Sequence, residues 1–84
     1  MYKVYVLYSP VFRKTYVGFS ADLDARLRSH NFLATKGYTV KYRPWVLIYT
    51  EVFSLKSEAI RRERELKSGK GRAFIKSIIS EKYK

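Results

Sequence analysis

The side chains that could carry out a reaction gather in one short stretch, residues 15–31. Tyr16 lies there in a β-prone run that ends at Gly18, a residue that permits a tight turn or a close approach of another segment. Arg26 and His30 follow four residues apart, so a helix places them on one face. A phenol, a guanidinium and an imidazole would then meet at one place, where they could move a proton and stabilise a developing negative charge.

The other residue types in the chain limit the catalytic mechanisms that are possible. The chain has no cysteine and a single histidine, which excludes thiol catalysis and metal sites built from several histidines. The stretch Gly69-Lys70-Gly71 lacks the spacing of a phosphate-binding loop. The acid that completes the set is Glu63, at the edge of the predicted inward face of a helix. A carboxylate there needs a divalent metal or an arginine as its partner.

This combination of groups suits the hydrolysis of a phosphodiester. A metal would neutralise the phosphate and activate water, an arginine would stabilise the transition state, and a tyrosine or histidine would take the proton. The net charge of +11, from 18 basic and 7 acidic residues, favours nucleic acid as the partner. An anionic membrane is disfavoured because the predicted helices carry no strip of large exposed apolar residues.

The size and composition of the chain bound its organisation. The 84 residues correspond to one domain, residues 1–84. The absence of cysteine suits a reducing compartment, and no apolar run approaches the roughly 20 residues that a membrane span needs. We therefore expect a cytoplasmic protein that has no membrane partner.

Two strands are expected at the start of the chain, residues 2–8 and 15–19. The short gap between them argues for an antiparallel hairpin. If the hairpin is symmetric about residues 10–11, Tyr5 lies opposite Tyr16 or nearly so. The two phenols would then lie close together on one face of the sheet.

The remaining elements complete the order strand, strand, helix, strand, helix, helix, which is typical of an α/β sandwich with helices covering three strands. In the second of the three helices, the apolar residues expected to face inward are Leu55, Ala59, Ile60 and Leu66. The expected elements are a helix over 21–30 with Ser20 as N-cap, a basic loop over 31–44, a strand over 45–53 whose first half is buried on both faces, a helix starting at Ser54 or Ser57, and a last helix over 72–82.

Two tripeptides give the chain a family signature. Lys3-Val4-Tyr5 and Tyr16-Val17-Gly18, whose tyrosines are eleven positions apart, resemble the paired motifs of the GIY-YIG nuclease superfamily. Lysine stands where the first motif has glycine, and valine replaces isoleucine in the second. Within the superfamily, the chain resembles small single-domain bacterial proteins that are similar to the nuclease domain of the excision-repair incision enzyme.

The resemblance implies a role for five side chains. Arg26 and His30 fall where the family carries its catalytic arginine and, in the second helical turn, a histidine or tyrosine, and Glu63 falls where it carries a metal-binding glutamate. Tyr5 or Tyr16 would be the general base, while Arg26 would hold the scissile phosphate and His30 would assist. Glu63 would bind one Mg²⁺ or Mn²⁺.

The resemblance also implies an α+β fold with a three-stranded antiparallel sheet flanked by helices. The implied function is that of a metal-dependent DNA endonuclease, structure-specific and related to repair or recombination, with RNA as the second possible substrate. Specificity would be low or supplied by a protein partner, and the sequence leaves the oligomeric state open. The basic residues expected to bind nucleic acid are Lys36, Lys41, Arg43, Arg62, Lys67, Lys70 and Arg72.

Each of these residues, taken alone, has a structural alternative. Tyr5 and Tyr16 could be ordinary sheet residues, Arg26 could pair with Asp22 for about 0.3–0.5 kcal/mol, and Glu63 could pair with a nearby cation. The alternative functions are a non-cleaving nucleic-acid-binding module of the same fold and a small RNA- or ribosome-associated protein. The positive charge supports the nuclease and the non-cleaving module equally, whereas the joint presence of the tyrosines, the arginine and the acid favours the enzyme.

Overall fold

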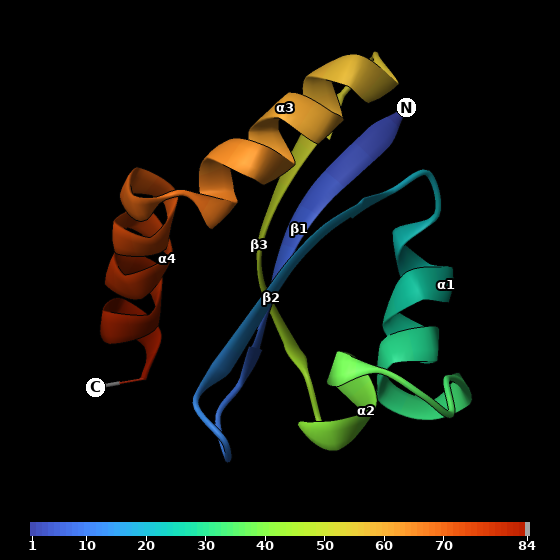
Figure 1. Ribbon diagram of the computed structural model, residues 1–84, viewed down its shortest axis with the longest axis vertical. Helices are drawn as coiled ribbons and strands as arrows, with labels where there is room; N and C mark the ends of the chain where they lie inside the picture. The colour runs from blue at the N-terminus through green and yellow to red at the C-terminus, as the bar shows by residue number, and fades with distance from the viewer. Residues whose placement is uncertain (84) are drawn as a thin grey trace.

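The computed structural model describes residues 1–83 and contains a three-stranded sheet between two groups of helices (Figure 1). All strand pairs are antiparallel, and the strand order is β2-β1-β3, which confirms the predicted α+β class. The elements in chain order are β1 (Tyr2–Ser9), β2 (Lys14–Ser20), α1 (Leu23–Arg28), the π-helical turn η1 (Ser29–Leu33), α2 (Tyr38–Lys41), β3 (Val46–Phe53), α3 (Lys56–Lys67) and α4 (Gly69–Lys82).

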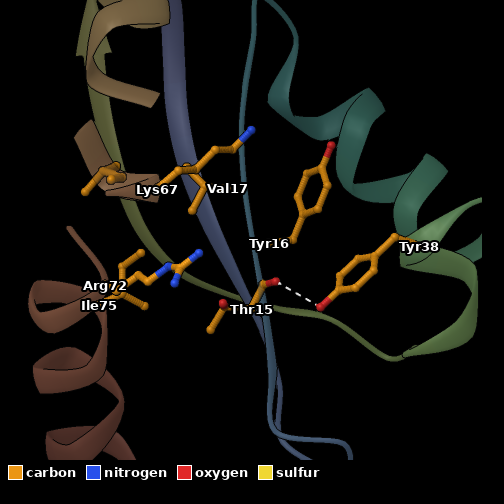
Figure 2. Close-up of a pocket in the computed structure, with 8 residues that line it drawn as sticks. Thr15, Tyr16, Val17, Tyr38, Lys67, Arg72 and Ile75 are labelled. Carbon is orange, nitrogen blue, oxygen red and sulfur yellow. Dashed lines mark hydrogen bonds between the residues drawn. The ribbon is translucent and has the colours of Figure 1, made fainter. Parts of the chain in front are cut away.

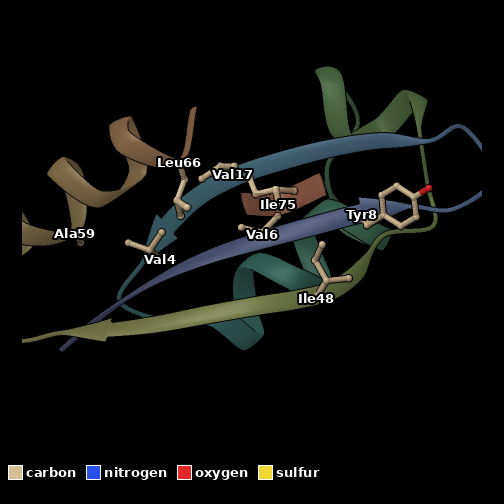
Figure 3. Packing of buried hydrophobic residues seen from close by; sticks show 8 residues of the cluster. All are labelled: Val4, Val6, Tyr8, Val17, Ile48, Ala59, Leu66 and Ile75. Atoms are coloured by element: carbon tan, nitrogen blue, oxygen red, sulfur yellow. The ribbon is translucent and has the colours of Figure 1, made fainter. Parts of the chain in front are cut away.

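β1 is the central strand, and two small cores lie on its opposite faces. Val4 and Val6 point toward α3 and α4, where they pack in the cluster drawn in Figure 3. Tyr5 and Leu7 point the other way and pack with Trp45 and with side chains of α1. All four β1 residues are fully buried, and each such apolar side chain contributes about 1.5–3 kcal/mol. The prediction that this strand is covered on both faces is confirmed.

The register of the first hairpin differs from the predicted one. Tyr5 pairs with Gly18, and Tyr16 pairs with Leu7, so the expected pairing of the two tyrosines is wrong by two positions. The reason is the turn, which holds four residues, Pro10–Arg13, and is centred one residue later than predicted. A shift by two residues keeps every side chain on its own face. The two phenol rings therefore still face the same side, with centroids 6.3 Å apart.

α1 begins after Asp22, whereas the sequence predicted a start after Ser20. The Asp22 carboxylate accepts a hydrogen bond from the backbone N–H of Ala25 at 3.1 Å, which is the N-cap interaction. Ser20 is instead the last residue of β2, and its hydroxyl oxygen accepts from the N–H of Asp22 at 3.0 Å. Helical backbone then continues through η1, past the predicted end at His30.

β3 is an edge strand. The prediction that its first half is buried on both faces is wrong. Val46 and Leu47 are 40% and 37% exposed because the helices cover this edge only in part. The pairing with β1 shifts between Val6 and Leu7, which leaves Ile48 as the extra residue of a β-bulge. Ile48 itself is buried.

α3 begins with Leu55 in the N-cap position, between the two predicted serines. The N–H of Leu55 donates to the Glu58 carboxylate at 3.3 Å, and this bond fixes the start of the helix. Leu55 is 60% exposed, so its predicted inward position is wrong, whereas Ala59 and Leu66 are buried as predicted.

α4 begins at Gly69, three residues before the predicted start, because Ser68 caps it. The Ser68 hydroxyl oxygen accepts from the N–H of Gly71 at 3.5 Å, so the helix starts within the expected break. Ile75 is buried in this helix, and Phe74 is exposed. In the region expected to be a loop, the short helix α2 forms. Within residues 1–83, no helix is long and apolar enough to cross a membrane.

The junction of α3 and α4 yields a stability prediction. Gly71 is buried where α4 starts against the end of α3, and a Cβ there would clash with the Glu65 carbonyl oxygen and the Leu66 backbone. Gly71→Ala should therefore lower the free energy of unfolding by about 1–3 kcal/mol, measured by urea titration. Gly69→Ala is the matched control, since its Cβ meets nothing within 4 Å and should be neutral or stabilising. Equal stabilities of the two variants would contradict this view of the junction.

Candidate active site at the free edge of β2

Tyr5 reaches the free edge of the sheet by crossing the backbone of Gly18. The two residues are paired across β1 and β2, and a Cβ at position 18 would lie 2.7 Å from the Tyr5 hydroxyl oxygen. It would also lie 3.1 Å from Cε1 of Tyr16. Gly18 lies inside β2 without a positive φ, so the predicted tight turn does not occur there. Its role is to permit the close approach of the tyrosine ring.

Three aromatic side chains meet at this edge. The Tyr5 hydroxyl and Nε2 of His30 form a buried hydrogen bond of 2.9 Å, in which the donor depends on the imidazole tautomer. The ring centroids of Tyr16 and His30 are 4.8 Å apart. The structure thus brings together two phenols and the only imidazole, from β1, β2 and η1.

Two side chains hold η1, and therefore His30, in position. The Asn31 amide forms a double hydrogen bond with the backbone of Trp45, accepting from its N–H at 2.7 Å and donating to its carbonyl at 3.2 Å. Arg43 donates from Nε and Nη2, at 2.6 to 3.0 Å, to the carbonyls of Ser29, His30 and Ala34. Arg43 therefore has a structural role, and its expected contact with nucleic acid stays a prediction.

The electrostatics of the cluster favour neutral side chains at pH 7. Burial raises the pKa of Tyr5, and interaction with the Arg26 guanidinium opposes that rise. Negative charge on Tyr16 or Glu63 would raise the Tyr5 pKa further. Burial lowers the pKa of His30, and the positive charges of Arg26 and Arg43 lower it more. A neutral His30 whose proton is on Nδ1 can accept a hydrogen bond from the Tyr5 hydroxyl at Nε2.

Arg26 lies on α1 beside the two tyrosines. Interaction with the Tyr5 hydroxyl is the main cause that raises the pKa of Arg26, and Tyr16 adds to it. Among residues 1–83, Arg26 forms no ion pair with Asp22, so the structural alternative for this arginine is not realised. Its fixed positive charge is available at the tyrosine cluster, where a phosphate oxygen would be stabilised.

Glu63 belongs to α3, which packs on the face of the sheet opposite to α1. Its side chain is 20% exposed, and Lys67 is its cation, with Nζ 3.6 Å from Oε1. The influence of its charge on the pKa of Tyr5 indicates that the carboxylate lies within electrostatic range of the phenol. The expected position at the border of the inward face therefore agrees with the structure.

The donor set of the site suits a hard cation with few protein ligands. Within residues 1–83, no group of three or more acidic, histidine or cysteine side chains could hold a metal ion. Glu63 would therefore supply one carboxylate, with water and substrate phosphate as the other ligands. Mg²⁺ commonly binds in this way because it keeps several of its waters, and Mn²⁺ also prefers oxygen ligands. The residues present thus fit the expected cation.

Two of the basic residues predicted to bind nucleic acid lie at the site. Lys67 and Arg72 line a pocket beside β2, and Tyr16 and Tyr38 line it from the other side (Figure 2). Arg62 is instead engaged by acids, with Nε 2.8 Å from Glu51. The three remaining lysines are exposed, and their contact with nucleic acid stays a prediction: Lys36, Lys41 and Lys70.

Tyr38 is the residue of this region that sequence reasoning did not select. Its hydroxyl donates to the carbonyl oxygen of Thr15 at 3.4 Å, and its ring packs against Tyr42 with centroids 4.9 Å apart. In the sequence, both tyrosines occur among basic residues of an expected loop, so no signal separates them. The start of α2 brings Tyr38 to β2.

Comparison with known proteins agrees with this geometry. Residues 1–77 match the model of the GIY-YIG catalytic domain family. The chain therefore belongs to the GIY-YIG catalytic domain family, as its two tripeptides suggested.

Its relatives include small bacterial proteins named UPF0213. The chain is 43% identical over 63 residues to UPF0213 protein SH2523 of Staphylococcus haemolyticus, covering 75% of this chain and 77% of that protein. It is 42% identical over 53 residues to a UPF0213 protein of Staphylococcus aureus, covering 63% and 65%. The solution structure of UPF0213 protein BH0048 from Bacillus halodurans is similar, with a TM-score of 0.54 and 29% identity over 93% of this chain and 85% of that one.

The buried imidazole yields a prediction on pH dependence. Because the folded state lowers the pKa of His30 below 6.5, the unfolded chain binds the proton more tightly. The free energy of unfolding should therefore fall as pH decreases through the range just below 6.5. His30→Asn should remove that part of the profile, and carboxylate titration at lower pH should remain. Parallel profiles between pH 5 and 7 would contradict a buried, neutral histidine.

Proposed function

We propose that this protein is a metal-dependent endonuclease that hydrolyses phosphodiester bonds of DNA. The site would consist of Tyr5, Tyr16, Arg26, His30 and Glu63. RNA is the second candidate substrate, because the site residues discriminate by phosphate and charge and not by the sugar. The resemblance to repair nucleases favours a structure-specific role in repair or recombination, in the cytoplasm, with a protein partner that supplies specificity.

The convergence of these groups at one edge carries the proposal. The tyrosines and the histidine belong to a cluster joined by a 2.9 Å hydrogen bond, while Arg26 and Glu63 come from helices on opposite faces. A cation and a carboxylate on two sides of a phenol cluster are what phosphoryl transfer needs for charge stabilisation and proton transfer. Membership of a catalytic domain family supports the same conclusion.

The exposure and charge of each side chain indicate its role in the proposed reaction. Tyr16 is half-buried and lines the pocket, so it is the phenol that can contact an attacking water. Tyr5 is fully buried, and its bond to His30 provides an outlet for a proton and a fixed position for the ring. Arg26 would bind an oxygen of the scissile phosphate and stabilise its charge as the new bond forms.

Glu63 would hold the cation, with Lys67 giving up its contact with the carboxylate. A bound Mg²⁺ or Mn²⁺ supplies charge neutralisation at the phosphate and acidifies a coordinated water. The released Lys67 ammonium would then be free to bind a neighbouring phosphate oxygen.

A non-cleaving module of the same fold is the alternative. It would also use the net charge of +11, so affinity for DNA does not separate the two. A semi-buried carboxylate at the centre of a phosphate-binding surface would, however, weaken a pure binder, because it repels the ligand. The presence of Glu63 at the edge therefore favours the enzyme.

The metal-binding role of Glu63 gives the central test. In Mg²⁺ or Mn²⁺, the wild-type chain should cut at least one of branched, nicked, plain duplex and single-stranded DNA. Glu63→Gln should reduce the cleavage rate by at least about 10²-fold, because a charge partner of the transition state is lost. DNA affinity measured in EDTA should persist or rise, because a negative charge is removed.

Glu65→Gln is the matched control for this experiment. Glu65 is two residues away on α3, its side chain is 56% exposed, and its partner is Arg62 at 3.6 Å. Its substitution should leave cleavage within a few-fold of wild type. Undiminished cleavage by Glu63→Gln would refute the metal assignment, and binding without any cleavage by the wild type would favour the non-cleaving module.

A further inference from the structure

A pocket of about 300 Å³ lies beside the free edge of β2, next to the tyrosine cluster. One wall is basic and comes from the α3–α4 junction, with Lys67 and Arg72. The other wall is aromatic, with Tyr16 and Tyr38. Figure 2 shows the two walls on opposite sides of β2, with the nitrogen ends of the basic side chains directed toward the strand. A pocket between cations and aromatic rings has the chemistry of a nucleotide site.

The strand between the walls offers free backbone groups. The Thr15 carbonyl accepts a hydrogen bond from Tyr38, so it points away from β1. Along a strand, alternate residues direct their backbone groups to the same side, so the N–H and carbonyl of Val17 also point outward. Val17 lines the pocket, and its N–H is therefore a donor that a phosphate oxygen or a base could use.

The basic wall is suited to a phosphate adjacent to the scissile one. Within the described part of the chain, no acid forms an ion pair with Arg72, which is exposed. Lys67 lines the pocket and also contacts Glu63, so it connects the pocket with the carboxylate of the candidate active site. Two phosphates of one strand could thus be bound side by side, one at Arg26 and Glu63 and the next at Arg72.

The aromatic wall has one well-fixed, accessible ring. Tyr38 is 44% exposed, yet its ring packs against Tyr42 at 4.9 Å and Trp45 at 6.0 Å between centroids. Its hydroxyl is fixed by the Thr15 carbonyl. A ring that is already ordered loses little conformational entropy when a base stacks on it.

We infer that this pocket binds the nucleotide next to the scissile phosphate, with its base stacked on Tyr38 and its phosphate held by Lys67 and Arg72. The inference rests on the proposed function, because it takes the tyrosine cluster as the site of the scissile phosphate. The base at this position must be unpaired to reach the ring. Substrates would therefore have a single-stranded or extruded nucleotide at the cut.

The test measures binding in EDTA, so that it does not depend on cleavage. The probe is a fluorescent single-stranded hexamer of thymidylate, together with six versions that each carry one abasic position. Tyr38→Ala should weaken binding of the intact hexamer by about 5- to 150-fold, the effect of losing one stacked base. Tyr38→Phe keeps the ring and should bind within about two-fold of wild type. The matched control is Tyr83→Ala, because Tyr83 is 40% exposed and does not line this pocket.

The abasic series locates the stacked base. At one position, the abasic probe should bind wild type and Tyr38→Ala equally, because without that base the Tyr38 ring has no partner to stack on. Arg72→Ala should lower the slope of log Kd against log salt by about 0.7, as loss of one phosphate contact does. Lys56→Ala removes a charge from the far end of α3 and should leave the slope unchanged.

The outcomes separate this inference from the nuclease proposal. Unchanged binding by Tyr38→Ala, or an equal loss in Tyr83→Ala, would overturn the stacking role. Absence of any probe position coupled to Tyr38 would do the same. Coupling between Tyr38 and one position, in a protein that never cleaves with metal, would support the nucleotide pocket while overturning the nuclease. Circular dichroism of each variant establishes that its fold is intact.

Discussion

The contact between the Tyr5 ring and the backbone of Gly18 is the constraint on which the site depends. Tyr5 belongs to the central strand, where side chains normally end inside a core. Because position 18 has no side chain, the phenol crosses β2 and meets His30 at a hydrogen-bond distance of 2.9 Å. A glycine of one strand thus determines where a tyrosine of its neighbour can act. The family signature therefore has glycine at this position because a side chain would clash with the tyrosine, and not because the backbone adopts a special conformation.

The small sheet explains how two opposite charges reach one place. The strand order is β2-β1-β3, so only β2 separates the central strand β1 from the free edge of the sheet. Helices on both faces can therefore approach that edge, Arg26 from α1 and Glu63 from α3, and both influence the pKa of Tyr5. Burial works against ionising the phenol, and the arginine works for it. Burial outweighs the arginine, so Tyr5 and His30 form a hydrogen-bonded pair of neutral groups.

The sequence predicts the parts of this arrangement that follow from simple periods. Tyr5 and Tyr16 face the same side because strands alternate, whatever the exact register, and helical spacing brings Glu63 to the border of α3. Details that depend on tertiary contacts escape such reasoning. The four-residue turn sets the register, the bulge at Ile48 shifts the pairing of β3 with β1, and Arg43 donates hydrogen bonds to the carbonyls of η1. The catalytic roles were suggested by the resemblance, because each residue alone has an ordinary structural explanation.

The most direct test of the account is to give position 18 a side chain. In Gly18→Ala, the Cβ would occupy the space of the Tyr5 hydroxyl, so the bond to His30 should break or lengthen. We predict that the His30 ring signals shift in NMR spectra and that its pKa changes, while cooperative unfolding persists and metal-dependent cleavage falls at least tenfold. Gly69→Ala, the same substitution in open space, should change none of these. Unaltered His30 signals and full cleavage in Gly18→Ala would contradict the claim that the Tyr5–Gly18 contact builds the site.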